Sequence, residues 1–290
     1  MTTVAVLGYS GVLGKAVLEA FSNENFNVSF PIKVVTSKDM PSNEKIEFVK
    51  ASIDETLVDK LKGIDVLISL LPGKEDLLKT LEPIIVSIKP KFYIPSEFGN
   101  DLDVLDEKLL LPPFVYKFDH NKRLEGQAIK VVRIYTGFFR FPPIFLYAYT
   151  DIIGVVQKNR EVKVVGDYET KVVDYCTLED IANSVAAIAT TDPKHVLDSY
   201  RISSNRILLK DIVAQLEAEQ NQEYKIVNIT IEDQFRAVEQ NPSFENIIFC
   251  CYSQGPGNGL IFEKNDNEVI NPQSSLWTWN SNNTATGPGS

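Results

Sequence analysis

Cysteine is scarce in this sequence, with only Cys176, Cys250 and Cys251 among 290 residues. Two of the three are neighbours that cannot easily bridge to each other, and an odd count leaves a thiol without a partner. The sequence therefore argues against a disulfide framework. It favours a reducing compartment, and we expect a cytoplasmic protein.

Basic charge is also in deficit, with 29 Lys and Arg against 39 Asp and Glu and a net charge of −10 at pH 7. Nucleic acids and anionic membranes both require a basic face, so neither is expected as the main partner. Apolar runs are too short for a membrane span. The first expected strand begins so early that no room is left for a secretion signal.

Histidine occurs only at His120 and His195, which are too few and too distant in sequence to suggest a metal site. Both are expected at the surface. Neither a zinc-ligand spacing nor a nucleophilic serine elbow is found, so no metal site is expected and serine hydrolase chemistry is not indicated.

The sequence does contain short apolar stretches that alternate with segments of helical periodicity. Strands are expected at 3–8, 32–37, 46–53, 64–71, 91–96 and 130–135. Helices are expected after the first strand and at 56–63, 75–89 and 116–127. Most of these strands lack polar alternation, which indicates a parallel sheet covered on both faces. The predicted fold class is α/β, a Rossmann-type doubly wound parallel sheet.

The character of the chain changes after residue 136, where aromatic residues and Pro become dense. Short strands are expected within 161–176 and at 224–231, and helices at 178–190, 208–220 and 231–240. We therefore assign 1–136 to the Rossmann lobe and 137–280 to a smaller α/β lobe interleaved with the sheet. The small and polar residues 281–290 are expected to be a disordered tail.

Gly8, Gly11 and Gly14 are spaced as G-x-x-G-x-x-G between the first strand and the first helix. In a dinucleotide-binding turn the first glycine permits the tight turn and the second lets the backbone approach the pyrophosphate. The third permits close packing of helix on strand. A plain strand–helix turn is the alternative, but the position at the first strand favours a nucleotide.

The end of the second strand distinguishes the two nicotinamide cofactors. A carboxylate there accepts the ribose hydroxyls of NAD, whereas a basic residue pairs with the 2′-phosphate of NADP. Here the strand ends in Thr36, Ser37 and Lys38, with Lys45 shortly after, although Asp39 is also close. Hydroxyl and ammonium donors favour NADP(H), with solvated surface lysines as the alternative.

Three segments in this order, "VAVLGYSGVLG", "KFYIPSEFGND" and "FVYKFDHNKR", resemble the isoflavone-reductase-like and NmrA-like proteins. These are atypical short-chain dehydrogenases with an NADP-binding Rossmann lobe and a smaller substrate lobe. The resemblance covers nearly the whole chain, and "PSEFGND" is its most specific segment. It is similar to the plant phenylpropanoid reductases of the group.

The resemblance implies a set of functional positions. Its phosphate loop falls on Gly8, Tyr9, Ser10, Gly11, Val12 and Leu13, and a second basic position falls on Lys45. The usual arginine at the end of the second strand is replaced by Thr36. The catalytic lysine of the family falls on Lys117. The expected cofactor contacts are completed by Leu71, Pro72, Ser96, Glu97, Phe98, Lys117, Thr136, Gly137 and Phe138.

Lys117 is expected to hold a ribose hydroxyl or to protonate the substrate. Hydride transfer leaves negative charge on the acceptor, which a nearby proton donor or cation stabilises. The usual Tyr three residues ahead of such a lysine is absent, because position 113 is Pro. Tyr116 is adjacent, and on a helix the two side chains diverge. Without the resemblance, "KFDHNKR" is typical of a solvated helix face.

Six aromatic residues after the sixth strand are candidates for a pocket wall, although aromatic side chains more often belong to the core. They are Phe138, Phe139, Phe141, Phe145, Tyr147 and Tyr149. Taken together, the sequence predicts an NADPH-dependent reductase of a small apolar carbonyl, enone or phenylpropanoid-like compound, monomeric or homodimeric. The alternatives are an NmrA-like sensor that binds NADP(H) without turnover and acts on a protein partner, or a scaffold without ligand.

Overall fold

The computed structural model describes residues 1–140 and 150–280. The expected tail at 281–290 and the aromatic residues Phe141, Phe145, Tyr147 and Tyr149 lie outside this described part. The N-terminal half contains a five-stranded parallel sheet with the order β3-β2-β1-β4-β5. Its strands are β1 (Thr2–Leu7), β2 (Val28–Thr36), β3 (Ile46–Lys50), β4 (Val66–Ser69) and β5 (Phe92–Ile94).

The sheet continues beyond β5 through further parallel pairings. Tyr93 forms a parallel bridge with Val131, and β6 (Arg133–Tyr135) then pairs in parallel with β11 (Ser199–Arg201). All four residues of β4 and the last four of β1 are buried, because helices cover both faces of a parallel sheet. These observations confirm the predicted Rossmann-type fold.

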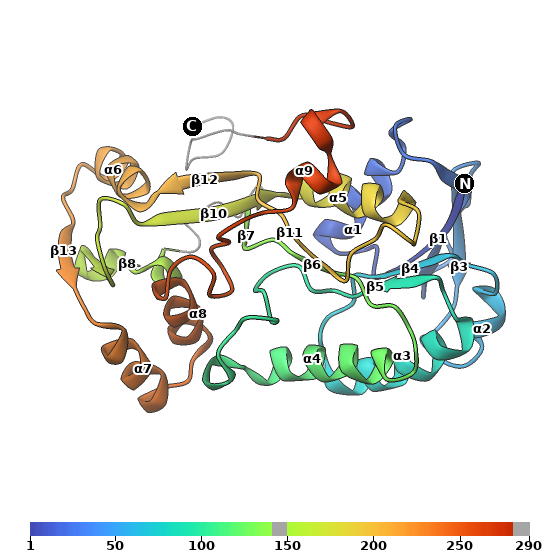
Figure 1. The fold of residues 1–290 in the computed structure, drawn as a ribbon, viewed down its shortest axis with the longest axis horizontal. Helices are drawn as coiled ribbons and strands as arrows, with labels where there is room; N and C mark the ends of the chain where they lie inside the picture. Colours follow the sequence, from blue (N-terminus) through green and yellow to red (C-terminus); the bar gives the residue numbers. More distant parts are fainter. Residues whose placement is uncertain (141–149, 281–290) are drawn as a thin grey trace.

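Two pairs of helices cover the two faces of the sheet (Figure 1). Helices α1 (Val12–Ala20) and α5 (Leu178–Thr190) pack together on one face. Helices α3 (Glu75–Ile88) and α4 (Pro112–Glu125) pack together on the other face, with the short α2 (Leu57–Lys60) beside α3. Helix α5 can approach α1 closely because its inner positions include the buried Ala182, Ala186 and Ala189. The C-terminal half thus supplies a covering layer for the first sheet.

The rest of the C-terminal half forms a second packed region (Figure 1). One sheet has the order β12-β10-β7 and another the order β13-β9-β8. The strands are β7 (Phe138–Arg140), β8 (Val155–Val156), β9 (Glu161–Val164), β10 (Val172–Thr177), β12 (Asn205–Leu208) and β13 (Lys225–Asn228). The helices are α6 (Leu209–Gln220), α7 (Ile231–Gln240), α8 (Phe244–Ser253) and α9 (Asn267–Ile270).

Among the elements that differ from the sequence-based expectation, three lie at or near the site described below. Helix α8 was not predicted, because every residue from Ile247 to Ser253 is buried and no polar stripe marks it. Helix α4 begins at Pro112, four residues earlier than expected, since proline fits the first turn of a helix. Phe138–Arg140, expected in a pocket wall or an irregular connection, form strand β7.

All three cysteines are buried free thiols. In the part of the chain that the structure describes, none of the helices combines the length and the apolar character that crossing a bilayer requires. Among the same residues no group of three or more His, Cys, Asp and Glu side chains is placed to hold a metal ion.

Candidate active site

Two of the three loop glycines are required by the backbone around them. Gly8 has φ +84°, and a Cβ there would lie 2.8 Å from the carbonyl of Leu70. A Cβ on Gly14 would lie 2.3 Å from the Tyr9 carbonyl oxygen, so only glycine lets α1 pack this closely on the loop. A Cβ on Gly11 would meet only the Gly8 oxygen at 3.7 Å, an ordinary contact. The middle position therefore leaves the approach to the loop backbone open.

Helix α1 begins directly after this loop, and its N-cap residue has no side chain that could cap the first turn. Gly11 is the N-cap residue, no side-chain hydrogen bond is made there, and the first turn has no acidic residue. Val12 in that turn is 55% exposed. The first N–H groups and the positive end of the helix dipole favour an anionic ligand such as a phosphate.

The glycine loop and the end of β2 line one cleft of about 290 Å³, which we call the loop cleft. Thr36 Oγ1 accepts a hydrogen bond from the Lys38 amide at 3.2 Å, which shapes the turn after β2. The lining residues are Gly8, Tyr9, Ser10, Val35, Thr36, Ser37, Lys38, Ala51, Ser52, Ile53 and Leu71. The structure therefore brings together most of the positions expected near the pyrophosphate and the adenosine ribose.

Lys45 is not brought to this cleft. It precedes β3, its carbonyl accepts a hydrogen bond from the Ile32 amide, and its Nζ lies 5.8 Å from the centroid of the Phe30 ring. These contacts place it at the amino end of the sheet, whereas Gly8 and Thr36 lie at the carboxyl end. The five residue-to-residue steps from Lys45 to Lys50 span roughly 16 Å in an extended strand. The structure thus separates Lys45 from the position that the resemblance implied.

Helix α4 directs two polar side chains, Lys117 and Asn121, inward toward the loop after β5. Lys117 Nζ donates to the Ser96 carbonyl oxygen at 2.5 Å and lies 4.0 Å from Glu97 Oε2. Asn121, one turn further along, donates from Nδ2 to Glu97 Oε1 at 2.8 Å. The Lys117 side chain is only 23% exposed. The alternative of a solvated helix face is therefore wrong for this residue.

Glu97 is a buried carboxyl beside this ammonium group, with 3% of its surface exposed. Burial raises the pKa of the Glu97 carboxyl, against the opposing effects of the Lys117 charge and the Asn121 hydrogen bond. An ammonium group has three donors, of which the Ser96 carbonyl takes one. Lys117 therefore retains donor capacity beyond its hydrogen bond to the protein backbone.

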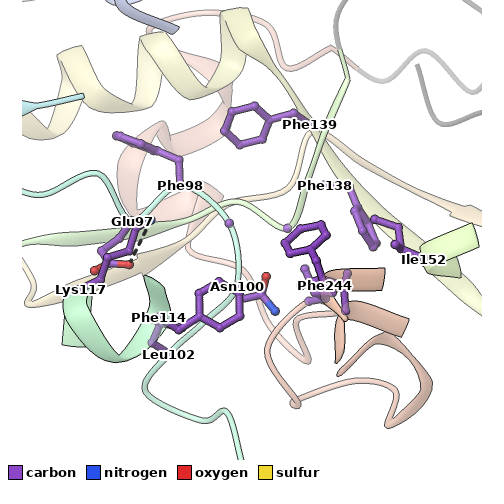
Figure 2. Close-up of a pocket in the computed structure, with 14 residues that line it drawn as sticks. Glu97, Phe98, Asn100, Leu102, Phe114, Lys117, Phe138, Phe139, Ile152 and Phe244 are labelled. Atoms are coloured by element: carbon purple, nitrogen blue, oxygen red, sulfur yellow. Dashed lines mark ion pairs between the residues drawn. The ribbon is translucent and has the colours of Figure 1, made fainter. Parts of the chain in front are cut away.

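Lys117 and Glu97 stand at one side of a second cavity, of about 270 Å³, which we call the aromatic cavity. Figure 2 shows Phe98, Phe114, Phe138, Phe139 and Phe244 around it, with the Lys117–Glu97 ion pair marked. The remaining lining residues are Gly99, Asn100, Leu102, Gly137, Ile152, Ile248 and Leu260. Asn100 Nδ2 is buried there and has no hydrogen-bond partner among the residues that the structure describes. The walls suit a flat apolar ligand that carries a polar group.

The two cavities are linked by the segment after β4. Leu71 lines the loop cleft, and two residues later Gly73 packs against the stem of Lys117. A Cβ on Gly73 would lie 2.8 Å from Lys117 Cε. Two residues span at most about 7 Å of chain. A ligand bound along this edge of the sheet can therefore reach from the glycine loop to the Lys117 ammonium.

The other expected contacts are placed as follows. Gly137 and Phe138 line the aromatic cavity, and Phe139 does so as well. Thr136 is fully buried, and within residues 1–140 and 150–280 its Oγ1 has no hydrogen-bond partner. Pro72 is exposed between Leu71 and Gly73.

Several residues at the site were not found from the sequence. Gly73 and Asn121 carry no motif of their own, and their roles appear only once α4 is packed against the sheet. Phe244 and Ile248 come from α8, and Leu260 from the segment after it, all more than a hundred residues beyond Lys117. A pattern within one segment does not show which distant side chains complete a cavity.

His120 is buried, which corrects its expected place at the surface. Its exposed fraction is 1%, Nδ1 lies 3.0 Å from Glu82 Oε1, and Nε2 lies 3.3 Å from the Tyr93 hydroxyl. Burial lowers the pKa of His120, while the hydrogen bond with Glu82 opposes this effect. The imidazole therefore joins α4 to α3 and β5 as a neutral group.

Comparison with known proteins agrees with this fold. The sequence matches the NmrA-like family over residues 1–252. The chain belongs to that family.

The bifunctional pinoresinol-lariciresinol reductase 2 of Thuja plicata is 25% identical over 268 residues, which cover 84% of this chain and 83% of that protein. Among solved structures, an isoflavone reductase superimposes with a TM-score of 0.67 at 18% identity and covers 96% of this chain and 97% of its own. A binary complex of leucoanthocyanidin reductase with NADPH from Vitis vinifera superimposes with a TM-score of 0.59 at 18% identity, over 87% and 86% of the two chains.

Proposed function

We propose that this protein is an NADPH-dependent reductase of a small, apolar carbonyl, enone or phenylpropanoid-like compound, with Lys117 as its catalytic residue. The observation that carries the proposal is the position of the Lys117 ammonium at the side of the aromatic cavity, next to the buried Glu97. The similarity to pinoresinol-lariciresinol and isoflavone reductases supports the reaction class.

The residues present fit a nicotinamide dinucleotide. A pyrophosphate would be held by the N–H groups after Gly11, where a helix N-terminus is uncapped. The adenosine end would occupy the loop cleft beside Ser37 and Lys38, and the nicotinamide would lie near Gly73 and Lys117. The NADPH complex of leucoanthocyanidin reductase, which shares the fold, supports NADPH as the cofactor.

The residues around the aromatic cavity have different roles in the reaction. When bound, NADPH supplies a hydride. Lys117 holds at Nζ the proton that the acceptor needs at the atom where negative charge develops. Ser96 and Glu97 fix the position of that ammonium group, and Asn121 fixes Glu97. The phenylalanine side chains exclude water and orient a flat acceptor, and Asn100 Nδ2 offers it a hydrogen bond.

The experiment combines a cofactor titration with a substrate screen. NADPH and NADH binding is measured by calorimetry, and carbonyl and enone compounds are then screened by loss of nicotinamide absorbance. We expect Lys117→Ala to lower kcat about 10²- to 10⁴-fold, the contribution typical of a positioned proton donor, with NADPH binding retained. Lys122→Ala, on the same helix with a side chain 57% exposed, is the matched control and should keep full activity. No turnover with any compound of a broad panel would count against a reductase.

The main alternative is an NmrA-like sensor that binds NADP(H) and passes its state to a protein partner. A sensor does not need a shaped apolar cavity beside the nicotinamide, whereas a reductase does. The aromatic cavity beside Lys117 therefore favours turnover. If NADPH binds and no compound is reduced, the sensor becomes the better proposal. If no dinucleotide binds, both are excluded and a scaffold without ligand remains.

We further propose that residues 1–136 form the cofactor-binding lobe and residues 137–280 the substrate-binding lobe interleaved with the sheet, in a monomer or homodimer. Phe138, Phe244 and Ile248 in the aromatic cavity support this division. The three free buried thiols support a reducing compartment, the cytoplasm.

A further inference from the structure

A cation that the sequence motifs did not indicate lies at the carboxyl end of β3. Lys50 is the last residue of that strand and pairs in register with Thr36 at the end of β2. Neighbouring strands lie about 4.8 Å apart, so the two backbones are adjacent. The next residues, Ala51, Ser52 and Ile53, line the loop cleft together with Thr36. Lys50 therefore stands beside the cleft that Lys45 does not reach.

A carboxylate already holds this cation. Lys50 Nζ forms a hydrogen-bonded ion pair with Asp39, the residue after Lys38. Both side chains are exposed, 58% for Lys50 and 83% for Asp39, and an ion pair in such surroundings is weak. Lys38 makes no ion pair with any residue in the described ranges 1–140 and 150–280. A more highly charged anion at this place can therefore compete with Asp39 for Lys50.

We propose that Lys50, and not Lys45, is the second cation for the 2′-phosphate of NADPH, and that Asp39 competes with this phosphate for Lys50. The proposal rests on the binding of NADPH in the loop cleft put forward above. A phosphate carries more negative charge than a carboxylate and forms strong charge-assisted hydrogen bonds with an ammonium group. The uncharged 2′-hydroxyl of NADH cannot displace Asp39, so NADH leaves the ion pair intact.

The same arrangement sets the degree of cofactor preference. The end of β2 offers Thr36 and Ser37, which carry no charge, so Lys38 and Lys50 supply the positive charge near the ribose. While Asp39 neutralises Lys50, part of the attraction for a 2′-phosphate is lost. Asp39 is thus a specificity-determining residue that weakens the preference for NADPH over NADH.

The test measures binding of NADPH and NADH to the full chain by calorimetry, without any substrate. Lys50→Ala should weaken NADPH binding about fivefold, as expected for loss of one exposed ion pair, and leave NADH binding unchanged. Lys45→Ala is the matched control and should change neither. The fold is kept in Lys50→Ala because Lys60 Nζ donates to the Lys50 carbonyl and not to its side chain.

Asp39→Asn should tighten NADPH binding about threefold by freeing Lys50. In the Lys50→Ala background Asp39→Asn should change NADPH affinity clearly less, because Lys50 is then no longer there to be freed. Equal effects of Lys50→Ala and Lys45→Ala on NADPH, or an undiminished Asp39→Asn effect in the double variant, would overturn the inference while leaving the proposed function in place. If the unaltered protein binds neither dinucleotide, the proposed function fails and this inference fails with it.

Discussion

Replacement of Gly73 by Ala tests whether the position of Lys117 matters for the reaction. A Cβ at residue 73 would lie 2.8 Å from Lys117 Cε, 3.1 Å from Cγ and 3.4 Å from Cδ. Non-bonded carbon atoms prefer about 3.5 to 4.0 Å, so the lysine stem must withdraw by roughly 1 Å. The φ angle of Gly73 is outside the left-handed region, so alanine fits the backbone there.

We expect Gly73→Ala to lower the reaction rate and to leave the fold intact. The crowded atoms belong to a flexible side chain, and a Gly→Ala change at a compatible position alters stability by about 1 kcal/mol or less. The ammonium, however, moves away from the Ser96 carbonyl, which it contacts at 2.5 Å. Misplacement of a reacting group by about 1 Å costs on the order of 10²-fold in rate. We therefore expect Gly73→Ala to lower kcat about 10²-fold.

The assay compares three quantities in the same preparations: kcat with an acceptor from the screen, the Kd of NADPH by calorimetry, and the midpoint of thermal unfolding. Gly126→Ala is the control, because its Cβ at the end of α4 makes ordinary contacts of 3.4 and 3.5 Å. An unchanged kcat in Gly73→Ala would refute the argument. So would a loss of activity explained entirely by weaker NADPH binding or by unfolding.

Two further predictions concern the glycine loop and the buried histidine. Gly14→Ala places a Cβ 2.3 Å from the Tyr9 oxygen, so it should abolish dinucleotide binding and lower the unfolding midpoint, whereas Gly11→Ala, with its nearest contact at 3.7 Å, should keep the fold. Calorimetry and thermal unfolding separate the two outcomes, and equal behaviour of both variants would contradict the packing argument. Burial lowers the pKa of His120, so the folded state binds fewer protons than the unfolded state. The contribution of neutral His120 to the stability of the fold is therefore complete above about pH 6.5 and is lost as the pH falls. The unfolding midpoint should drop as the pH falls below about 6.5, and His120→Gln should reduce that drop.

Some features of the site could be predicted from the sequence alone, and others could not. Gly8, Gly11 and Gly14 were predictable, because a turn between a buried strand and a helix restricts residue type locally. Lys117 was found because the segment around it resembles a known family. On its own, "KFDHNKR" has the composition of a solvated helix face. Its burial depends on α4 packing against the loop after β5, which joins residues about twenty positions apart.

The assignment of Lys45 shows a different limit. Sequence order placed it shortly after β2, but in a parallel sheet the chain returns to the amino end before the next strand begins. Lys45 therefore lies at the start of β3 and Lys50 at its end. Counting residues from a motif does not reveal at which end of the sheet a connecting residue lies.

The sequence by itself determined the alternation of strands and helices, the parallel sheet and the turn that prepares an anion site, because periodicity and glycine spacing act over one or two adjacent elements. Only the tertiary structure decided that Lys117 meets Glu97, that α8 closes the aromatic cavity, and that Lys50 stands where Lys45 was expected. Those contacts join residues from 14 to more than 100 positions apart. Their proximity depends on the packing of whole elements and not on any local pattern.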